Sequence, residues 1–303
     1  MKKVSVILTT YNSQDCILKT IDSILNQDGI NELFSIELII VDDCSTDNTT
    51  DILKQRNIPF LSTSKNSGGP NAGRNIGLKA VTGDYICIAD HDDEWNPNKI
   101  KTMLPYFKEV SIVTSGYTLE DINTKKEIVR VNEHEGGFKR YSKNTTFLDK
   151  LKKNLTGQNT YLGSIMYAAE LKHILFEEHF GVVDFDWILM LFHQQESIEV
   201  SQSLYRRYVD GKNLSLDENY RRKDFYYTLY FIERYERDYP KAYKIGYKKV
   251  HGSRARYYYL MDNMPKARFY FLKSGWSFKT VLYYICLLYT SPSPLDDISS
   301  SMP

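Results

Sequence analysis

Apolar runs and amphipathic segments alternate along the first hundred residues. Short runs rich in β-branched residues are separated by segments whose apolar side chains recur at helical spacing. The runs predict strands over 4–8, 38–41, 58–61 and 85–89, and the spacing predicts helices over 17–25, 46–55, 71–81 and 97–107. Consecutive apolar positions are typical of strands that are buried on both faces. This alternation predicts βαβ units, and therefore an α/β fold with a mainly parallel sheet flanked by helices.

The hydrophobic pattern changes after about residue 110. Shorter apolar runs with polar turns from Val110 to about Tyr141 predict an antiparallel excursion of the sheet. We expect one more strand over 160–168 and a buried helix that begins at Trp187. After about residue 215 the chain becomes helical, aromatic and basic, and residues 256–272 predict a helical hairpin.

These changes in the pattern divide the chain into three parts. We expect an α/β domain over 1–210 and a helical C-terminal region over 211–288. Residues 289–303 contain the segment Ser291-Pro292-Ser293-Pro294 and show no periodicity, so we expect a disordered or non-native tail there.

Composition narrows the class of protein. The chain contains 39 Lys and Arg against 38 Asp and Glu, and this balance argues against a dedicated nucleic-acid-binding protein. The four cysteines show no C-x-x-C spacing, which argues against a zinc ribbon or a disulfide framework and favours a reducing compartment. The longest apolar stretch, Val281 to Tyr289, is about half the length of a membrane span. We expect a cytoplasmic protein, either free or peripheral at the inner face of the plasma membrane.

Polar side chains follow three of the predicted strands. Residues 9–12 follow the first strand, residues 42–45 the second and residues 90–93 the fourth. Open α/β sheets bind ligands at the carboxyl ends of their parallel strands, so we expect these segments to meet at one edge. The alternative is that Asp and Ser at each strand end only cap the following helix, which applies best to Asp42.

The segment Asp90-His91-Asp92-Asp93 has the most specific chemistry. Carboxylates held this close repel one another unless a cation lies between them, and their oxygens suit Mg²⁺ or Mn²⁺. Zinc is less suited, because only His91 is near and no cysteine accompanies it. The alternative is a solvated turn before the next helix.

Four segments in order resemble the family 2 glycosyltransferases of GT-A fold. They are Val4-Ser5-Val6-Ile7-Leu8-Thr9-Thr10-Tyr11-Asn12, Ile40-Val41-Asp42-Asp43-Cys44-Ser45-Thr46-Asp47, Asn71-Ala72-Gly73-Arg74-Asn75-Ile76-Gly77, and Asp84-Tyr85-Ile86-Cys87-Ile88-Ala89-Asp90-His91-Asp92-Asp93. The resemblance is specific over about residues 1 to 110, weakens towards residue 210 and says little beyond.

The resemblance implies roles in binding a nucleotide-sugar donor. Thr9 and Tyr11 would bracket the base, and Asp43 would accept a hydrogen bond from uracil or a similar ring. Arg74 would approach the diphosphate, since a guanidinium matches phosphate geometry.

The family's D-x-D element matches Asp90 and Asp92. Both would contribute to a Mn²⁺ or Mg²⁺ site that neutralises the leaving diphosphate, with Asp92 the first choice for direct ligation and Asp90 also facing the nucleotide.

An inverting transfer also needs a carboxylate base for the acceptor hydroxyl. The family places it in a Glu-Asp pair that opens a late helix, and Asp186 matches the second acid of that pair. Phe185 occupies the usual Glu position, which makes Asp184 the reserve candidate. The alternative is that Asp186 only caps the helix that begins at Trp187.

Two segments further along the chain have several interpretations. Tyr205-Arg206-Arg207-Tyr208 resembles a strand and loop that close over the donor diphosphate, with Tyr208 where many relatives carry histidine. The aromatic and basic segment 220–273 suits a glycan or lipid-linked acceptor, an anionic membrane surface, or an ordinary helical cap.

The resemblance therefore implies an inverting, metal-dependent glycosyltransferase of surface polysaccharide synthesis, which moves a sugar from a donor such as a UDP-sugar to a hydroxyl of a glycan or lipid-linked acceptor. One alternative is a nucleotidyltransferase of related fold, which would need a glycine-rich loop after the first strand. The other is a non-catalytic scaffold that uses the helical C-terminal region.

Overall fold

The computed structural model describes residues 1–154, 156–180, 184–209, 218–275, 281 and 285. The chain divides into two compact units. The first consists of residues 1–147 and 158–221, and the second of residues 148–157 and 222–303. The predicted division into 1–210, 211–288 and 289–303 stays a prediction, and residues 211–217 and 289–303 lie outside the described residues.

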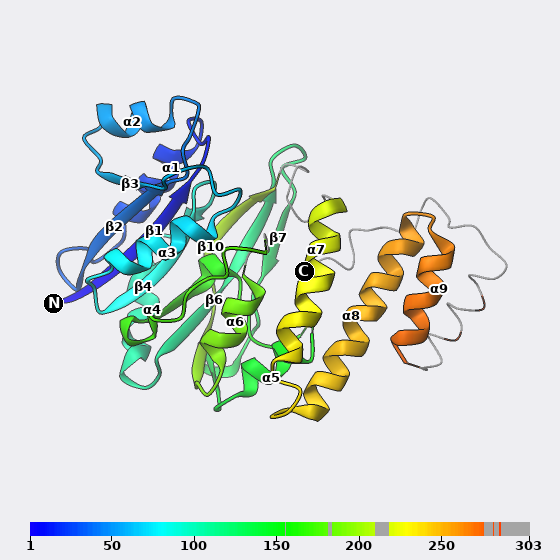
Figure 1. Cartoon of the computed structure of the whole chain (residues 1–303). Helices are drawn as coiled ribbons and strands as arrows, with labels where there is room; N and C mark the ends of the chain where they lie inside the picture. Colours follow the sequence, from blue (N-terminus) through cyan, green and yellow to red (C-terminus); the bar gives the residue numbers. More distant parts are fainter. Residues whose placement is uncertain (155, 181–183, 210–217, 276–280, 282–284, 286–303) are drawn as a thin grey trace. The chain divides into compact units, whose positions relative to one another are not determined.

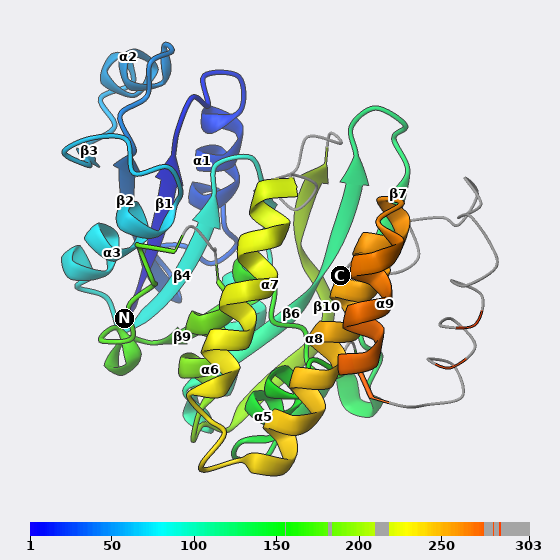
Figure 2. The same cartoon turned by 45° about the vertical axis from the view of Figure 1, so that its right-hand side comes forward.

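The described part of the first unit contains one ten-stranded sheet (Figures 1 and 2). Its strands are β1 (Lys2–Thr10), β2 (Phe34–Asp42), β3 (Phe60–Ser62), β4 (Tyr85–Asp90), β5 (Glu94–Trp95), β6 (Ile112–Asp121), β7 (Glu127–Arg130), β8 (Phe138–Tyr141), β9 (Ile165–Ala168) and β10 (Ser197–Val209). Their order is β3-β2-β1-β4-β9-β6-β10-β5, with β7 beside β6 and β8 beside β10.

The sheet is parallel where the sequence predicts βαβ units. Strands β3, β2, β1 and β4 run parallel to one another. Strand β9 then lies antiparallel to both β4 and β6, and β10 returns parallel to β6. The predicted α/β class is confirmed, with a parallel half followed by a mixed half.

Helices α1 (Ile17–Leu25), α2 (Thr49–Gln55), α3 (Asn71–Ala80), α4 (Lys99–Met103) and α6 (Phe185–Phe192) belong to this unit, and α5 (Thr145–Leu151) begins in it. Helix α3 packs against β1 and β2. Two of its glycines face the sheet: a Cβ at Gly73 would lie 3.0 Å from Thr9 Cγ2, and one at Gly77 would overlap Ile7. The missing side chains therefore let α3 approach the sheet closely.

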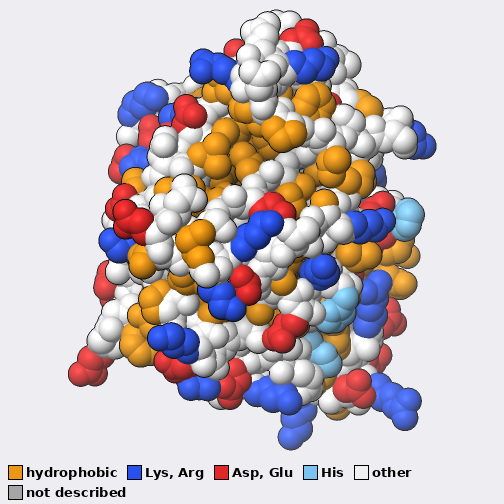
Figure 3. Space-filling view, turned by 90° about the vertical axis from the view of Figure 1, so that its left-hand side faces the viewer, with side chains coloured by type: hydrophobic (Ala, Val, Ile, Leu, Met, Phe, Trp, Pro, Cys, Tyr) orange, Lys and Arg blue, Asp and Glu red, His pale blue; other side chains and the backbone are white. Residues whose placement is uncertain are grey.

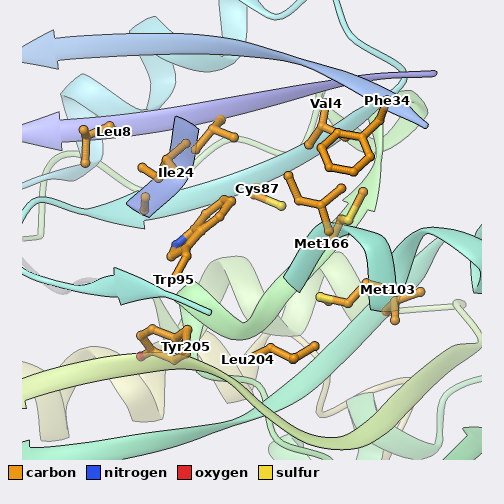
Figure 4. Packing of buried hydrophobic residues seen from close by; sticks show 14 of the residues in the cluster. Val4, Leu8, Ile24, Phe34, Cys87, Trp95, Met103, Met166, Leu204 and Tyr205 are labelled. Atoms are coloured by element: carbon orange, nitrogen blue, oxygen red, sulfur yellow. The ribbon is translucent and has the colours of Figure 1, made fainter. Parts of the chain in front are cut away.

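Several elements contribute side chains to the main hydrophobic core of the first unit (Figure 4). Cys87 of β4, Trp95 of β5, Met103 of α4, Met166 of β9 and Tyr205 of β10 are all buried there. The two-residue strand β5 pairs with β10, placing Trp95 opposite Tyr205. This pairing fixes the segment that directly follows Asp90-His91-Asp92-Asp93.

The described part of the second unit is helical. It includes α7 (Glu218–Glu233), which begins at the end of the first unit, α8 (Pro240–Leu260) and α9 (Met264–Lys273). Ala255 and Tyr258 of α8 pack with Ala267 and Phe271 of α9. The side chain of Asn263 accepts a hydrogen bond from the Lys266 backbone N–H and caps α9. The predicted helical hairpin is confirmed, and its first helix begins earlier than expected.

No helix within the described residues is long and apolar enough to cross a membrane.

Three elements differ from the prediction. The helix expected over 97–107 ends as α4 at Met103 and continues as a 3₁₀ helix over Leu104–Lys108, where Pro105 lacks an N–H to donate. Of the strand expected over 160–168, only Ile165–Ala168 pairs with the sheet. The region after residue 110 contains the ten-residue β6, which lies inside the sheet between β9 and β10. Burial by neighbours that are distant in sequence makes β6 longer than its local pattern indicated.

The face that lies to the left in Figure 1 carries mixed charge. Among its coloured residues, Lys and Arg are interspersed with Asp and Glu, and hydrophobic side chains gather in its upper middle part (Figure 3). Exposed hydrophobic residues of the first unit include Leu33 and Leu61. Such interspersed charges are typical of an ordinary solvated surface.

The close approach of α3 is testable with Gly77→Ala. The added methyl group would overlap the fully buried Ile7, so we expect the free energy of unfolding to fall by about 1–3 kcal/mol. The control is Gly69→Ala, where nothing lies within 4 Å of the added Cβ and the change should stay within about 0.5 kcal/mol. Urea unfolding measures both variants; equal stabilities would contradict this packing.

Candidate active site

The register of the parallel strands brings three predicted segments together. Thr9 lies opposite Val41 of β2 on one side and Asp90 of β4 on the other, and Thr10 lies opposite Asp42. The carboxyl ends of β1, β2 and β4 therefore meet at one edge of the sheet, as predicted. Thr9 is buried, whereas Tyr11, just beyond the strand, is exposed.

Asp43 organises the loop that follows β3. Its buried carboxylate accepts hydrogen bonds from the Thr63 hydroxyl (2.8 Å) and from the backbone N–H and hydroxyl of Ser67. Asp42 accepts hydrogen bonds from the backbone N–H and hydroxyl of Ser45. Helix α2 begins only at Thr49, with Asn48 as its N-cap residue, so Asp42 does not cap it as the alternative expected. Asp43 thus holds the loop beside the site, and its predicted contact with a nucleotide base stays a prediction.

The segment Asp90-His91-Asp92-Asp93, called the acid loop below, forms a fixed turn between β4 and β5. The buried Thr20 hydroxyl of α1 lies within hydrogen-bond distance of two of its carbonyls, 2.7 Å from that of His91 and 2.9 Å from that of Asp93. The Asp93 N–H also donates to the Asp90 carbonyl (3.3 Å). Asp92 is exposed and Asp93 is buried, so the turn presents one carboxylate to solvent and encloses another.

The three carboxylates of the acid loop have different electrostatic environments. Burial would raise the pKa of Asp90, but the charge and hydrogen bond of Arg74 outweigh it and lower the pKa. The protein that crowds around Asp92 raises its pKa by desolvation, and the charge of Asp90 raises it further. Burial and both neighbouring aspartates raise the pKa of Asp93 well above its usual range. The loop is thus a concentration of negative charge that a cation would relieve.

Arg74 connects helix α3 to the acid loop. Arg74 is 1% exposed. Its guanidinium donates to Asp90 Oδ1 at 2.8 Å and to Asn71 Oδ1 at 3.1 Å, and lies 5.2 Å from the ring centroid of Phe176. Its Nε has no hydrogen-bond partner among the described residues. Such a buried cation is stable only beside an opposite charge, so Arg74 and Asp90 depend on each other.

The same helix holds the segment that leads towards α6. Asn75 donates to the Phe176 carbonyl and accepts from the Phe176 N–H, both at 2.8 Å, and Asn71 donates to the Glu177 carbonyl at 2.7 Å. Trp187 of α6 stacks on Phe176, with ring centroids 4.6 Å apart. Helix α3 therefore contacts the acid loop directly and, through the segment at Phe176, supports the helix of the predicted base.

Both base candidates lie at the start of α6. Asp186 is in its first turn and buried, and Asp184 is its N-cap residue and half-buried. The pKa of Tyr161 is raised. Burial is the main cause, and the charges of Asp184 and Asp93 add to it against the lowering effect of Arg207. Asp184 therefore lies within electrostatic reach of a tyrosine that also senses the acid loop.

Arg207 is a candidate site residue in the segment 205–208, which the sequence analysis expected to close over the donor diphosphate without selecting Arg207 itself. Its guanidinium donates to the Tyr161 hydroxyl at 2.6 Å and lies 4.9 Å from the centroid of that ring. Burial lowers its pKa, but Tyr161, Tyr205, Asp93 and Asp90 outweigh this effect and raise it. Pairing of β10 with β5 brings this cation to the acid loop.

The alternation of side chains along a strand distinguishes Arg207 from its neighbour. Arg206 forms ion pairs with Glu120 and Glu127, away from the acid loop. Adjacent strand residues point to opposite faces, so of two consecutive arginines only one can face the site. The two consecutive arginines were visible in the sequence, but the pairing of their strand, β10, with β5 was not.

Tyr208 stands where the resemblance would place a histidine. Its hydroxyl donates to Glu94 and accepts from Lys19 at 3.1 Å, and Lys19 forms an ion pair with Glu94 at 2.8 Å. This group joins α1, β5 and β10 beside the acid loop.

The described side chains fit a divalent ion that shares its ligands with a substrate. No group of three or more His, Cys, Asp or Glu residues in the described ranges is arranged to hold a metal ion. One or two carboxylates are, however, the usual protein contribution to a Mg²⁺ site completed by phosphate oxygens and water. Asp92, exposed and crowded by negative charge, is the carboxylate that fits this chemistry.

The mixed sheet, with a parallel half whose strand ends carry polar residues, has a GT-A-like α/β fold. Residues 5–172 match the family described as Glycosyl transferase family 2, and the chain belongs to this family.

Relatives and solved structures agree with this assignment. The chain is 40% identical over 113 residues to poly(ribitol-phosphate) beta-N-acetylglucosaminyltransferase TarS of Staphylococcus aureus, covering 36% of this chain and 19% of that protein. It is 40% identical over 123 residues to the putative teichuronic acid biosynthesis glycosyltransferase TuaG of Bacillus subtilis, covering 38% of this chain and 47% of that protein. The matches thus span less than half the length of these relatives.

The fold is similar to that of S. aureus TarS residues 1–349 in a structure with UDP-GlcNAc. The TM-score is 0.65 at 20% sequence identity, covering 90% of this chain and 82% of that one.

Proposed function

We propose that this chain is a glycosyltransferase that moves a sugar from a nucleoside-diphosphate donor, UDP-linked as our first choice, to a hydroxyl of a surface polymer or lipid-linked glycan. Membership of Glycosyl transferase family 2 supports the reaction class. The names of TarS and TuaG support a surface polymer as acceptor. The observation that carries the proposal is the meeting of Thr9, Asp43 and the acid loop at one sheet edge.

The donor diphosphate would lie between the acid loop and Arg207. Arg207 carries a guanidinium at the loop and matches the planar geometry of phosphate oxygens. Arg74 is buried and already engaged by Asp90 and Asn71. We therefore propose a positioning role for Arg74 in place of the direct diphosphate contact expected from the sequence.

A bound Mn²⁺ or Mg²⁺ would be held by Asp92, with Asp90 as the second carboxylate of the D-x-D element, and would neutralise charge on the diphosphate. The residues around it supply the rest of the site. Asp90 keeps its negative charge because Arg74 stabilises it, and the Thr20 hydroxyl lies within hydrogen-bond distance of the carbonyls on both sides of Asp92.

The transfer itself would be a single displacement at the anomeric carbon. The base, Asp186 with Asp184 as reserve, accepts the proton of the acceptor hydroxyl. The acceptor oxygen then forms the new bond to the anomeric carbon on the face opposite the diphosphate. The bond between that carbon and the diphosphate oxygen breaks, and its electron pair leaves with the nucleoside diphosphate. Attack from the opposite face inverts the configuration of the sugar.

Donor binding is testable by calorimetric titration of UDP with and without Mn²⁺. We expect binding that needs Mn²⁺ in the wild type, because the acid loop repels an uncompensated diphosphate. Asp92→Ala should weaken binding with Mn²⁺ at least about tenfold, since a carboxylate ligand is lost. The control is Asp28→Ala, an exposed aspartate whose loss should leave the affinity unchanged.

Two results would contradict the donor site. If Asp92→Ala bound UDP as tightly as Asp28→Ala, Asp92 would not be a ligand. If the wild type bound none of UDP, GDP and dTDP with either metal ion, the transferase proposal itself would be wrong.

The base assignment is testable with Asp186→Asn and Asp184→Asn. Removing a general base slows transfer by about 10²–10⁴-fold, whereas UDP affinity should stay unchanged, because the base contacts the acceptor. We expect this loss for Asp186→Asn and a smaller loss for Asp184→Asn, measured as turnover with a saturating acceptor. The reverse order would move the role to Asp184. Losses below tenfold in both variants would contradict a base on α6.

A further inference from the structure

The second unit carries an excess of positive charge that the balance of the whole chain conceals. Residues 222–275 contain 13 Lys and Arg against 5 Asp and Glu. Helices α8 and α9 contain nine cations and no acidic residue. The cations are Lys241, Lys244, Lys248, Lys249, Arg254 and Arg256 on α8, and Lys266, Arg268 and Lys273 on α9. We call these nine side chains the basic hairpin.

The cations of the basic hairpin form no ion pair with any described residue. Within the described ranges, no carboxylate lies within 4.0 Å of any of its nine cations, whereas the first unit contains many ion pairs. Arg254 and Arg268 each have a buried Nε with no hydrogen-bond partner among the described residues. Seven of the nine cations are exposed. Uncompensated like charges destabilise a compact unit, so their concentration here calls for an external anion.

A buried histidine of α8 lies within the electrostatic influence of two of these cations. His251 of α8 lies against Tyr247 and Tyr270, and neither ring nitrogen has a hydrogen-bond partner among the described residues. Burial lowers its pKa to about 4, and the charges of Lys273 and Arg254 contribute to the lowering. Burial and the two neighbouring cations therefore both favour the uncharged form of His251.

We infer that the basic hairpin binds the acceptor, and that this acceptor is a polyanionic polymer whose phosphate or carboxylate groups alternate with polyol or sugar units. The inference rests on the proposed function for the identity of the polymer as acceptor. Lys241, Lys244 and Lys248 share one face of α8, opposite the buried Ala242 and Val250. They would contact successive anionic groups.

One exposed aromatic ring, that of Phe269, lies among the cations and suits the uncharged parts of such a polymer. On α9, Lys266, Phe269 and Lys273 follow one another at helical spacing, with the Lys273 ammonium 4.7 Å from the Phe269 ring centroid. An aromatic face packs against the apolar side of a sugar or polyol, while the flanking ammonium groups pair with anions. Cation and ring thus alternate along one face of the helix.

The distribution of these side chains favours a polymer over a membrane surface. A helix that lies on a membrane has one continuous apolar face opposite its charges. The exposed apolar side chains of α8 and α9 are interleaved with cations; they are Ile245, Leu260, Phe269 and Leu272. Lys249 and Arg256 lie on a different side of α8 from Lys244. A flexible chain can follow such a surface, whereas a flat bilayer cannot contact all of it.

Binding of the polymer to the second unit would raise its local concentration for the first. The two units belong to one chain, so a polymer held by one presents its hydroxyls to the other as an intramolecular partner. The expected signature is a lower KM for a long anionic acceptor than for a single neutral unit, with a similar kcat.

The test uses the full chain and a fluorescently labelled poly(glycerol phosphate) chain. The α8 variant carries three substitutions on the shared face of α8: Lys241→Gln, Lys244→Gln and Lys248→Gln. Glutamine keeps the helix propensity of lysine and removes its charge. The control replaces three exposed lysines of the first unit that form no ion pair among the described residues, with Lys79→Gln, Lys101→Gln and Lys126→Gln. Anisotropy is measured at increasing salt, and circular dichroism checks folding.

We expect the wild type to bind the polymer with an affinity that falls steeply with salt. The α8 variant should bind roughly tenfold to a hundredfold more weakly, with the slope of log affinity against log salt reduced by about 2. The control should stay within about twofold of the wild type. Equal affinity of the α8 variant and the wild type would overturn the inference, as would an equal loss in the control.

Two further probes test whether the basic hairpin binds a different partner. Vesicles of phosphatidylglycerol test a membrane, and single-stranded DNA with the same number of phosphates tests a nucleic acid. We expect weaker binding to both than to poly(glycerol phosphate) at physiological salt. Tenfold tighter binding of either probe, lost in the α8 variant, would overturn the inference in favour of that partner.

The α8 variant also separates this inference from the proposed function. Its titration with UDP and Mn²⁺ should equal that of the wild type, because the hairpin holds the acceptor and not the donor. If the wild type binds UDP but not the polymer, the inference fails and the proposed function stands. If the wild type binds the polymer but no nucleotide, the proposed function fails and the polymer loses its role as acceptor.

Discussion

The ion pair between the buried Arg74 and the partly exposed Asp90 is the interaction on which the rest of the site depends. Arg74 is 1% exposed, so its guanidinium needs an opposite charge, and Asp90 supplies it at the end of β4. The pair exists because α3 lies close to the sheet, which the glycines on its inner face allow. The neighbouring Asn71 and Asn75 hold the segment at Phe176, on which Trp187 of α6 stacks. One helix thereby sets the positions of the acid loop and of the predicted base helix.

Local patterns were sufficient to predict the parallel half of the sheet. Strands β1, β2 and β4 each contain an apolar run, and each is followed by a polar loop, so the hydrophobic pattern and the turn signals agree. The mixed half was predicted less well, because β6 and β10 are defined by pairing over more than eighty residues of sequence. The two-residue β5 is too short to show a hydrophobic period in the sequence. Its pairing with β10 nevertheless brings the end of β10 beside the acid loop.

The same distinction applies to the site residues. Thr9, Asp43, Asp90 and Asp92 follow directly on predicted strands, so the rule that ligands bind at strand ends was enough to group them. Arg207 lies at the end of a strand whose partners are remote, and only the fold shows that it meets the acid loop. The burial of Arg74 was equally invisible in the sequence, because it depends on Phe176 and on the approach of α3 to the sheet. Spacing identifies chemistry along a chain, but packing decides which groups contact a ligand and which only position others.

The central claim is that Arg74 acts on the donor through Asp90. The most direct measurement is the affinity for UDP with Mn²⁺ of Arg74→Met, which keeps the length of the side chain and removes its charge, against Arg56→Met at an exposed site. The account predicts that Arg74→Met stays folded but binds UDP at least about tenfold more weakly, because Asp90 loses the partner that fixes it. Arg56→Met should bind as the wild type does. An unchanged affinity in Arg74→Met would contradict the account.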